Sequence, residues 1–180
     1  MKRLLLITAL SLTICSCSSS GTKNKDTMGF FDKLFGKKGS TNKPKNQTSN
    51  IDKTSQIYID YQNKLLETKQ FYPFDRWRES YNDGLTQYTK QNCDKTKKVF
   101  DDLIASLIDL GGNGSEAQKK ELFKTAIIKT NKLNDEIDGL IETGEREDLC
   151  ELTDKITIAC GLDPHKYGDG EGLASEWREW

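Results

Sequence analysis

The chain has few of the residues on which enzymes and metal centres depend. Among its 180 residues there is one histidine, His165, and no pair of cysteines in a Cys-x-x-Cys spacing. It also has no Gly-rich phosphate-binding loop, and a single histidine leaves no nucleophile–histidine set to assemble. We therefore expect a protein that is not an enzyme and that binds no metal and no cofactor.

Proline and strand-like patterns are scarce as well. The chain has 3 prolines, and no run alternates between apolar and polar side chains as a half-buried strand does. Internal repeats are also lacking. The length suits one domain rather than two, and these absences favour an all-α fold for that domain.

Apolar runs long enough to be notable are limited to residues 4–12. This run is shorter than the roughly 20 residues that a helix needs to span a bilayer. Lys2 and Arg3 precede the run and small residues follow it, which is the layout of a secretory signal. We predict that residues 1–16 form a signal peptide that is removed.

A cysteine-containing motif, Ile14-Cys15-Ser16-Cys17, closes the signal. It resembles the lipobox of bacterial lipoproteins, which has an apolar residue three positions before the cysteine and a small residue directly before it. The resemblance implies that Cys17 receives diacylglycerol on its sulfur and anchors the protein in the cell envelope, with the domain facing the periplasm or the exterior. Cys15 fits less well because Ile14 precedes it. An ordinary cleaved signal peptide is the alternative.

Charge divides the mature chain into two parts. Residues 18–50 carry seven Lys against two Asp and are rich in Ser, Thr, Asn and Gly, a composition typical of a disordered linker. Residues 51–180 carry 18 Lys and Arg against 26 Asp and Glu. We expect a lipid-anchored basic linker over 17–50 and an acidic domain over 51–180, which would not bind nucleic acid directly.

One segment of the linker, residues 28–38, is amphipathic. Its apolar side chains fall on one side of a short helix and lysines cover the remainder. We expect these side chains to contact the membrane surface: Phe30, Phe31, Leu34, Phe35, Lys37 and Lys38. The alternatives are that the segment docks on the domain or stays disordered. Met28 is also a candidate alternative start.

Helical periodicity begins after Asn50 and continues through the domain. The spacing predicts a single bundle of about five helices and a short C-terminal helix. The second predicted helix starts near Pro73 and carries an aromatic stripe, which we assign to the core rather than to a ligand platform. Its members are Phe74, Trp77, Tyr81, Leu85 and Tyr88.

Capping residues predict several helix ends. Ser115 and Gln118 form a capping box at the start of the fourth helix. Thr143 is expected to cap the fifth helix. Gly111 and Gly161 should end the third and fifth helices, because glycine readily adopts left-handed dihedral angles.

Three cysteines remain in the domain: Cys93, Cys150 and Cys160. Cys150 and Cys160 are ten positions apart on one predicted helix, about 15 Å at the usual rise, which is too far for a disulfide. Cys93 could pair with either of them. Buried free thiols are the other interpretation, and the sequence leaves both open.

The start of the predicted fifth helix is acidic, with Glu145, Glu147 and Asp148 beside Arg146. Such acids suit the positive end of a helix dipole and more often face solvent than form a site. The stretch Leu140–Leu152, preceded by Asn131-Lys-Leu-Asn134, resembles an uncharacterised family of small helical bacterial domains. The resemblance implies a helical fold and no catalytic residue, and some relatives look like immunity proteins.

Two C-terminal stretches complete the candidates. The acids between Asp163 and Glu171 surround His165, but their spacing matches no calcium loop, so we assign them to a turn. Leu173, Trp177 and Trp180 share one face of a short helix, which packs back onto the bundle by default. An exposed Trp beside Arg178 would instead suit a partner-binding surface.

These observations lead to a hypothesis about function. We expect a lipid-anchored envelope protein whose acidic domain binds another protein, toxin immunity being one version. The alternative is a structural lipoprotein that tethers or spaces envelope components, and a metal-dependent enzyme is third. The candidate partner interface comprises Glu145, Glu147, Asp148, Trp177, Arg178 and Trp180.

Overall fold

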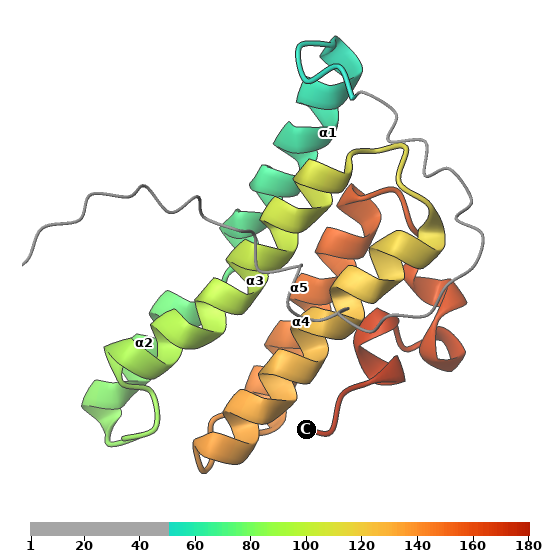
Figure 1. Cartoon of the computed structure of the whole chain (residues 1–180). Coiled ribbons are helices and arrows are strands. Elements are labelled where there is room, and N and C mark those ends of the chain that lie inside the picture. The colour runs from blue at the N-terminus through green and yellow to red at the C-terminus, as the bar shows by residue number, and fades with distance from the viewer. Residues whose placement is uncertain (1–50) are drawn as a thin grey trace, which may run out of the picture. The chain divides into compact units, whose positions relative to one another are not determined.

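The computed structural model describes residues 51–180, which form helices joined by short connections (Figure 1). Strands do not occur in this part of the chain, so the all-α prediction is confirmed. The signal peptide, the linker and the amphipathic segment lie outside the described residues. The α-helices are α1 (Gln56–Glu67), α2 (Phe74–Ser80), α3 (Lys90–Leu110), α4 (Glu116–Glu136) and α5 (Thr143–Ala159).

Side-chain caps begin α1 and α4. The Ser55 hydroxyl accepts a hydrogen bond from the backbone N–H of Tyr58 at 3.3 Å. At the start of α4, the Ser115 hydroxyl accepts from the backbone N–H of Gln118, whose side-chain oxygen accepts from the backbone N–H of Ser115. The predicted capping box is therefore confirmed, and it satisfies two donors that the helix itself cannot.

The ends of α3 and α5 follow the glycines, but the start of α5 differs from the prediction. Gly111, with φ 76°, is the C-cap of α3, and Gly161, with φ 86°, follows the C-cap of α5. Thr143 is the first helical residue of α5 rather than its cap. Glu142 takes the cap position, because its backbone N–H donates to the carboxylate of Glu145 at 3.2 Å.

The second helix is shorter than its aromatic spacing predicted. α2 ends at Ser80, and a single 3₁₀ turn, Tyr81–Asp83, leads to Gly84, which has φ 95°. A left-handed glycine directly after polar turn residues reverses the chain and stops the helix. As a result Tyr81 and Leu85 are 47% and 46% exposed, whereas Tyr88 is buried. The core assignment is wrong for Tyr81 and Leu85.

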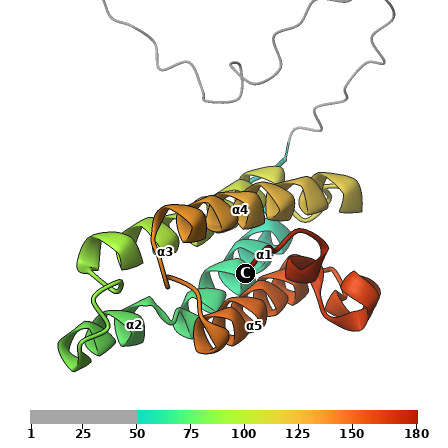
Figure 2. The same ribbon diagram turned by 90° about the horizontal axis from the view of Figure 1, so that it is seen from below.

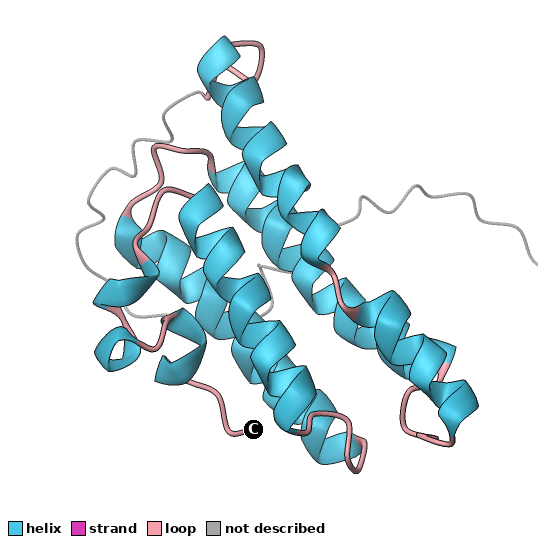
Figure 3. Cartoon of the chain, turned by 180° about the vertical axis from the view of Figure 1, so that it is seen from behind, coloured by secondary structure: helices cyan, strands magenta, loops and turns pink. Residues whose placement is uncertain are grey.

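The helices form two layers, as Figure 2 shows. α3 packs beside α4 in one layer, and α1, α2 and α5 lie in the other, where α1 contacts both α3 and α5. Seen from behind, α1 and α2 follow each other as one interrupted rod (Figure 3). The interruption contains the 3₁₀ turn Thr68–Phe71 and Pro73, which has no N–H to donate to a continuing helix.

Aromatic side chains dominate the core between the layers. Trp77 is 2% exposed, and its ring meets that of Phe74 edge-on at 5.3 Å and that of Tyr88 at 6.0 Å. The core assignments of these three residues are confirmed. Other fully buried apolar side chains come from the longer helices, from the connection before α5 and from the C-terminal residues: Leu65, Phe100, Ile104, Leu107, Phe123, Ile127, Leu140, Leu149, Leu152, Ile156 and Leu173.

The cysteines of the domain form no disulfide. Cys93, Cys150 and Cys160 are free, and the first and last are buried. Burial raises the pKa of Cys160 to about 11, so this thiol stays neutral at physiological pH. The cysteines therefore act as small apolar side chains.

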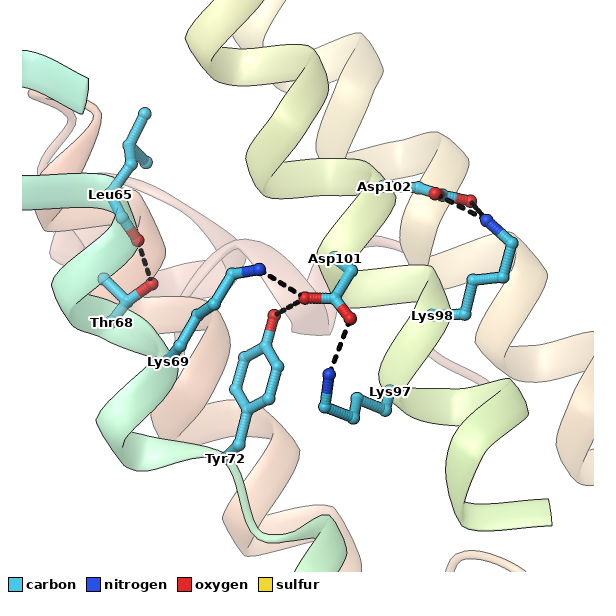
Figure 4. A network of polar contacts seen from close by, with 8 residues as sticks. All are labelled: Leu65, Thr68, Lys69, Tyr72, Lys97, Lys98, Asp101 and Asp102. Atoms are coloured by element: carbon cyan, nitrogen blue, oxygen red, sulfur yellow. Dashed lines mark hydrogen bonds and ion pairs between the residues drawn. The ribbon is translucent and has the colours of Figure 1, made fainter. Parts of the chain in front are cut away.

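A polar network connects the turn between α1 and α2 to α3 (Figure 4). The carboxylate of Asp101 accepts hydrogen bonds from the Lys69 ammonium at 2.5 Å, the Tyr72 hydroxyl at 3.1 Å and the Lys97 ammonium at 2.8 Å. Burial acts to raise the pKa of Asp101, but the hydrogen bonds from the two lysines outweigh it and the pKa is lowered. The network therefore favours the ionised carboxylate.

A buried lysine on α4 secures the end of α5. Lys119 is 5% exposed, and its ammonium donates to the carbonyl oxygens of Cys160 at 2.8 Å and Gly112 at 3.1 Å. Cys160 is the C-cap of α5, where the helix dipole is negative. The lysine charge therefore joins α4, the turn before it and the last carbonyl of α5.

Candidate protein-binding surface

The acidic first turn of α5 lies against the aromatic core on one side and faces solvent on the other. Glu145 is half-buried, whereas Glu147 is exposed and has no ion pair within residues 51–180. Burial, followed by the neighbouring Glu145 carboxylate, raises the pKa of Tyr88. Of these acids, Glu147 is the one available to a partner.

Asp148 connects α5 to α2. Its carboxylate accepts a hydrogen bond from the indole Nε1 of Trp77 at 2.8 Å and a second one from the guanidinium of Arg76. The Asp148 side chain is only 21% exposed, while that of Arg76 is 66% exposed. Asp148 thus supports the packing of α2 and offers little surface to a partner.

The C-terminal segment, residues 173–180, lies between α4 and α5. Its 3₁₀ turn, Leu173–Glu176, contacts both helices, and Figure 2 shows the chain end near them. Leu173 is fully buried, and Trp177 and Trp180 are half-buried against the core. The expected packing onto the bundle is confirmed, although the element is a 3₁₀ turn and not an α-helix.

Polar contacts also hold this segment. The side-chain amide of Asn131 on α4 donates to the carbonyl oxygen of Trp177 at 2.8 Å and accepts from the backbone N–H of Glu179 at 3.3 Å. The guanidinium of Arg178 donates to the Cys150 sulfur at 2.7 Å and to the Glu171 carboxylate at 3.2 Å. Burial raises the pKa of Cys150, so Arg178 faces a neutral thiol.

The predicted interface residues fall on two sides of α5. Asp148 points toward α2, and Cys150, which contacts Arg178, is two positions later and about 200° further round the helix. Asp148 is therefore separate from the C-terminal segment, whereas Glu147 is three positions before Cys150 and shares its face of α5. The sequence did not predict this arrangement, because its spacing does not indicate which helices residues 173–180 contact.

One surface feature was not predicted from the sequence. A cavity of about 410 Å³ lies where the exposed turn after α2 meets the start of α3. Its lining includes Arg78, Glu79, Tyr81, Tyr88 and Lys90. The only signal for it was the turn sequence ending in Gly84, which ends α2 and leaves the Tyr81 ring exposed.

The stretch after α5 behaves as a turn. Asp163 caps a 3₁₀ turn by accepting from the backbone N–H of His165 at 3.1 Å, and His165 itself is exposed. Within the described residues, no group of three or more His, Cys, Asp and Glu side chains is placed to hold a metal ion.

The lipidation and membrane-contact predictions concern residues that the structure does not describe. Cys17 and the amphipathic side chains (Phe30, Phe31, Leu34, Phe35, Lys37 and Lys38) all precede residue 51. Among residues 51–180, no helix combines the length and apolar character needed to cross a bilayer. These predictions remain predictions.

The excess negative charge of the domain is concentrated in its C-terminal part. Residues 142–180 contain eleven Asp and Glu against four Lys and Arg, whereas residues 51–141 contain fifteen against fourteen. α5 and the residues after it therefore carry nearly all of the net charge. Exposed acids on this part include Glu147 and Asp169.

Comparisons of the chain with models of protein families, with curated proteins and with solved structures found no match. The function must therefore be inferred from the residues of this chain.

Proposed function

We propose that the protein is a lipid-anchored component of the bacterial cell envelope whose helical domain binds a basic surface of another protein. The anchor is Cys17, and the basic linker over 17–50 lets the domain reach its partner. The membrane is contacted through the N-terminal lipid and the amphipathic segment 28–38. No nucleic acid, cofactor or metal takes part.

The observation that carries this proposal is the charge of residues 142–180. Eleven acids against four basic residues give this part a strong negative field, while the rest of the domain is nearly neutral. A one-sided field of this kind steers a positively charged partner toward one surface and speeds association. Immunity to a toxin with a basic active site is one function that such a surface supports.

The proposal predicts salt-sensitive capture of a stoichiometric partner. Full-length protein should retain a partner from envelope extract at low ionic strength and release it near 0.5 M salt, where surface charges are screened. Replacing Glu147 and Asp169 together by lysine should weaken capture several-fold, because surface charges act mainly on association rate.

A matched control separates the acidic surface from net charge alone. Glu121 and Asp135 are exposed on α4, outside residues 142–180, so replacing both by lysine changes the net charge equally and should leave capture unchanged. Equal loss in the control and the double variant, or the lack of any stoichiometric partner at low salt, would favour a structural lipoprotein that acts as a tether or spacer.

A further inference from the structure

The last residues of the C-terminal segment are held differently from its first ones. Leu173 and Ala174 are 0% and 1% exposed and belong to the core. Residues 177–180 follow the 3₁₀ turn outside any helix; Trp177, Arg178 and Trp180 are half-buried, whereas Glu179 is exposed. Their contacts with Asn131 on α4 and Cys150 on α5 define the surface that they cover, which we call the groove.

Recognition in this groove is directed at the main chain. Asn131 is 6% exposed. Its side-chain amide donates to the carbonyl of Trp177 and accepts from the backbone N–H of Glu179. Such a pair of hydrogen bonds depends on no particular side chain in the bound segment. Peptide-binding sites combine main-chain contacts of this type, which give affinity, with pockets for alternate side chains, which give specificity.

The side chains of residues 177–180 fit the groove incompletely. The indole Nε1 of Trp180 is buried and has no hydrogen-bond partner among the described residues. By contrast, Nε1 of the core residue Trp77 donates to Asp148 at 2.8 Å. Arg178 donates to a neutral thiol, which is a weak acceptor. A buried donor without an acceptor weakens the attachment, which makes the segment easier to displace.

We propose that the groove between α4 and α5 binds a short segment of a partner protein, and that residues 177–180 occupy it until that partner displaces them. The partner segment has aromatic residues three positions apart and a basic residue after the first, as in Trp177-Arg178-Glu179-Trp180. The acidic surroundings, including Glu171 beside Arg178, favour the basic residue. This inference rests on the protein-binding function proposed above.

The test uses a fluorescein-labelled peptide with the sequence of residues 176–180. A chain that stops after Glu176 should bind this peptide at least tenfold more tightly than the full chain, in which the groove is filled. In the shortened chain, Asn131→Ala should weaken binding by about tenfold, a loss expected for a central hydrogen-bonding residue. Asn63→Ala, at an exposed asparagine on α1, should not. A peptide with both tryptophans replaced by alanine should not bind.

A second variant covers the case in which the shortened chain does not fold. The Trp180→Ala substitution in the full chain leaves Leu173 in the core. This variant should bind the peptide, and hydrogen exchange at its Glu179 amide should be faster than in wild type. The proposal would be overturned if the shortened chain folds but does not bind the peptide, or if the full chain binds the peptide as tightly as the shortened chain does. Dimerisation of the full chain that requires residues 177–180 would assign the groove to a second copy instead.

The peptide titration uses no envelope extract, so its outcome is independent of the capture experiment. If the peptide binds but no salt-sensitive partner is captured, only the proposed role of the acidic surface is contradicted. Salt-sensitive capture without peptide binding would remove only the role of the groove.

Discussion

At the scale of single residues, the domain depends on a few charges that are partly withdrawn from water. Asp101 and Lys119 each bind groups from two parts of the chain, and Asp148 on α5 binds two side chains of α2. Removing the partner of a partly buried charge destabilises the fold by more than the intact pair stabilises it, because the remaining charge is left uncompensated. These residues are therefore the ones at which small changes should have large effects.

Replacing Asp101 by asparagine should lower the free energy of unfolding by about 1–3 kcal/mol at pH 7, because it removes charge-assisted hydrogen bonds from Lys69 and Lys97. The pKa of Asp101 is lowered in the folded state, so its contribution is present above the unfolded pKa and is lost as the pH falls through the folded value. Denaturant titrations should show the difference from wild type shrinking below about pH 4.

Asp102 provides the control for that prediction. It pairs with Lys98 on the same helix, and the Lys98 side chain is 72% exposed. Asp102→Asn should therefore cost at most about 0.5 kcal/mol, as exposed pairs of this spacing do. Equal effects of the two substitutions would show that the Asp101 network does not stabilise the turn between α1 and α2.

Lys119 carries the second prediction at this scale. Lys119→Met keeps the length of the side chain but leaves the carbonyls of Gly112 and Cys160 without their donor. We expect a loss of about 1–3 kcal/mol by thermal or chemical denaturation. Lys132→Met, at a lysine whose side chain is 77% exposed on the same helix, should change stability by no more than about 0.5 kcal/mol.

At the scale of elements, local signals predicted helix ends better than periodicity predicted helix length. The Ser115 capping box and the glycine at the end of α3 act within a few residues, so the sequence shows them directly. The stripe from Phe74 to Tyr88 has helical spacing throughout, yet Gly84 divides it. Spacing alone describes which side chains would share a face if the helix continued, and it does not say whether the helix continues.

Contacts between distant residues could not be predicted in this way. Asp148 and Arg76 are 72 positions apart, and Asn131 meets residues 46 and 48 positions later. Their side chains are ordinary for exposed helix positions, and only the packing of the elements brings them together. The fold class was therefore accessible from sequence, whereas the grouping of the candidate surface residues was not.

The divided aromatic stripe gives a paired prediction. Trp77→Ala should lower the free energy of unfolding by about 3–5 kcal/mol, because it leaves a large cavity in the core and removes the donor to Asp148. Tyr81→Ala should change it by no more than about 0.5 kcal/mol, since that ring is 47% exposed. Similar losses for both would mean that Tyr81 packs as the spacing first indicated.

At the scale of the whole molecule, attachment to the membrane is predicted to depend on one cysteine. Cys17→Ala should prevent lipidation and move the protein from the membrane fraction to the soluble fraction, whereas Cys15→Ala should not. Metabolic labelling with a palmitate analogue, followed by fractionation, measures both effects. Equal labelling of wild type and Cys17→Ala would contradict the assignment of the lipidated residue.

The position of Leu173 in the core has a consequence for when the domain acquires its structure. α1 packs on α5, and the fully buried side chain of Leu173 packs in the same core. A core assembled from sequence-distant segments cannot close while either segment is still being synthesised. The core around α1 and α5 therefore stays open until residue 173 has left the ribosome.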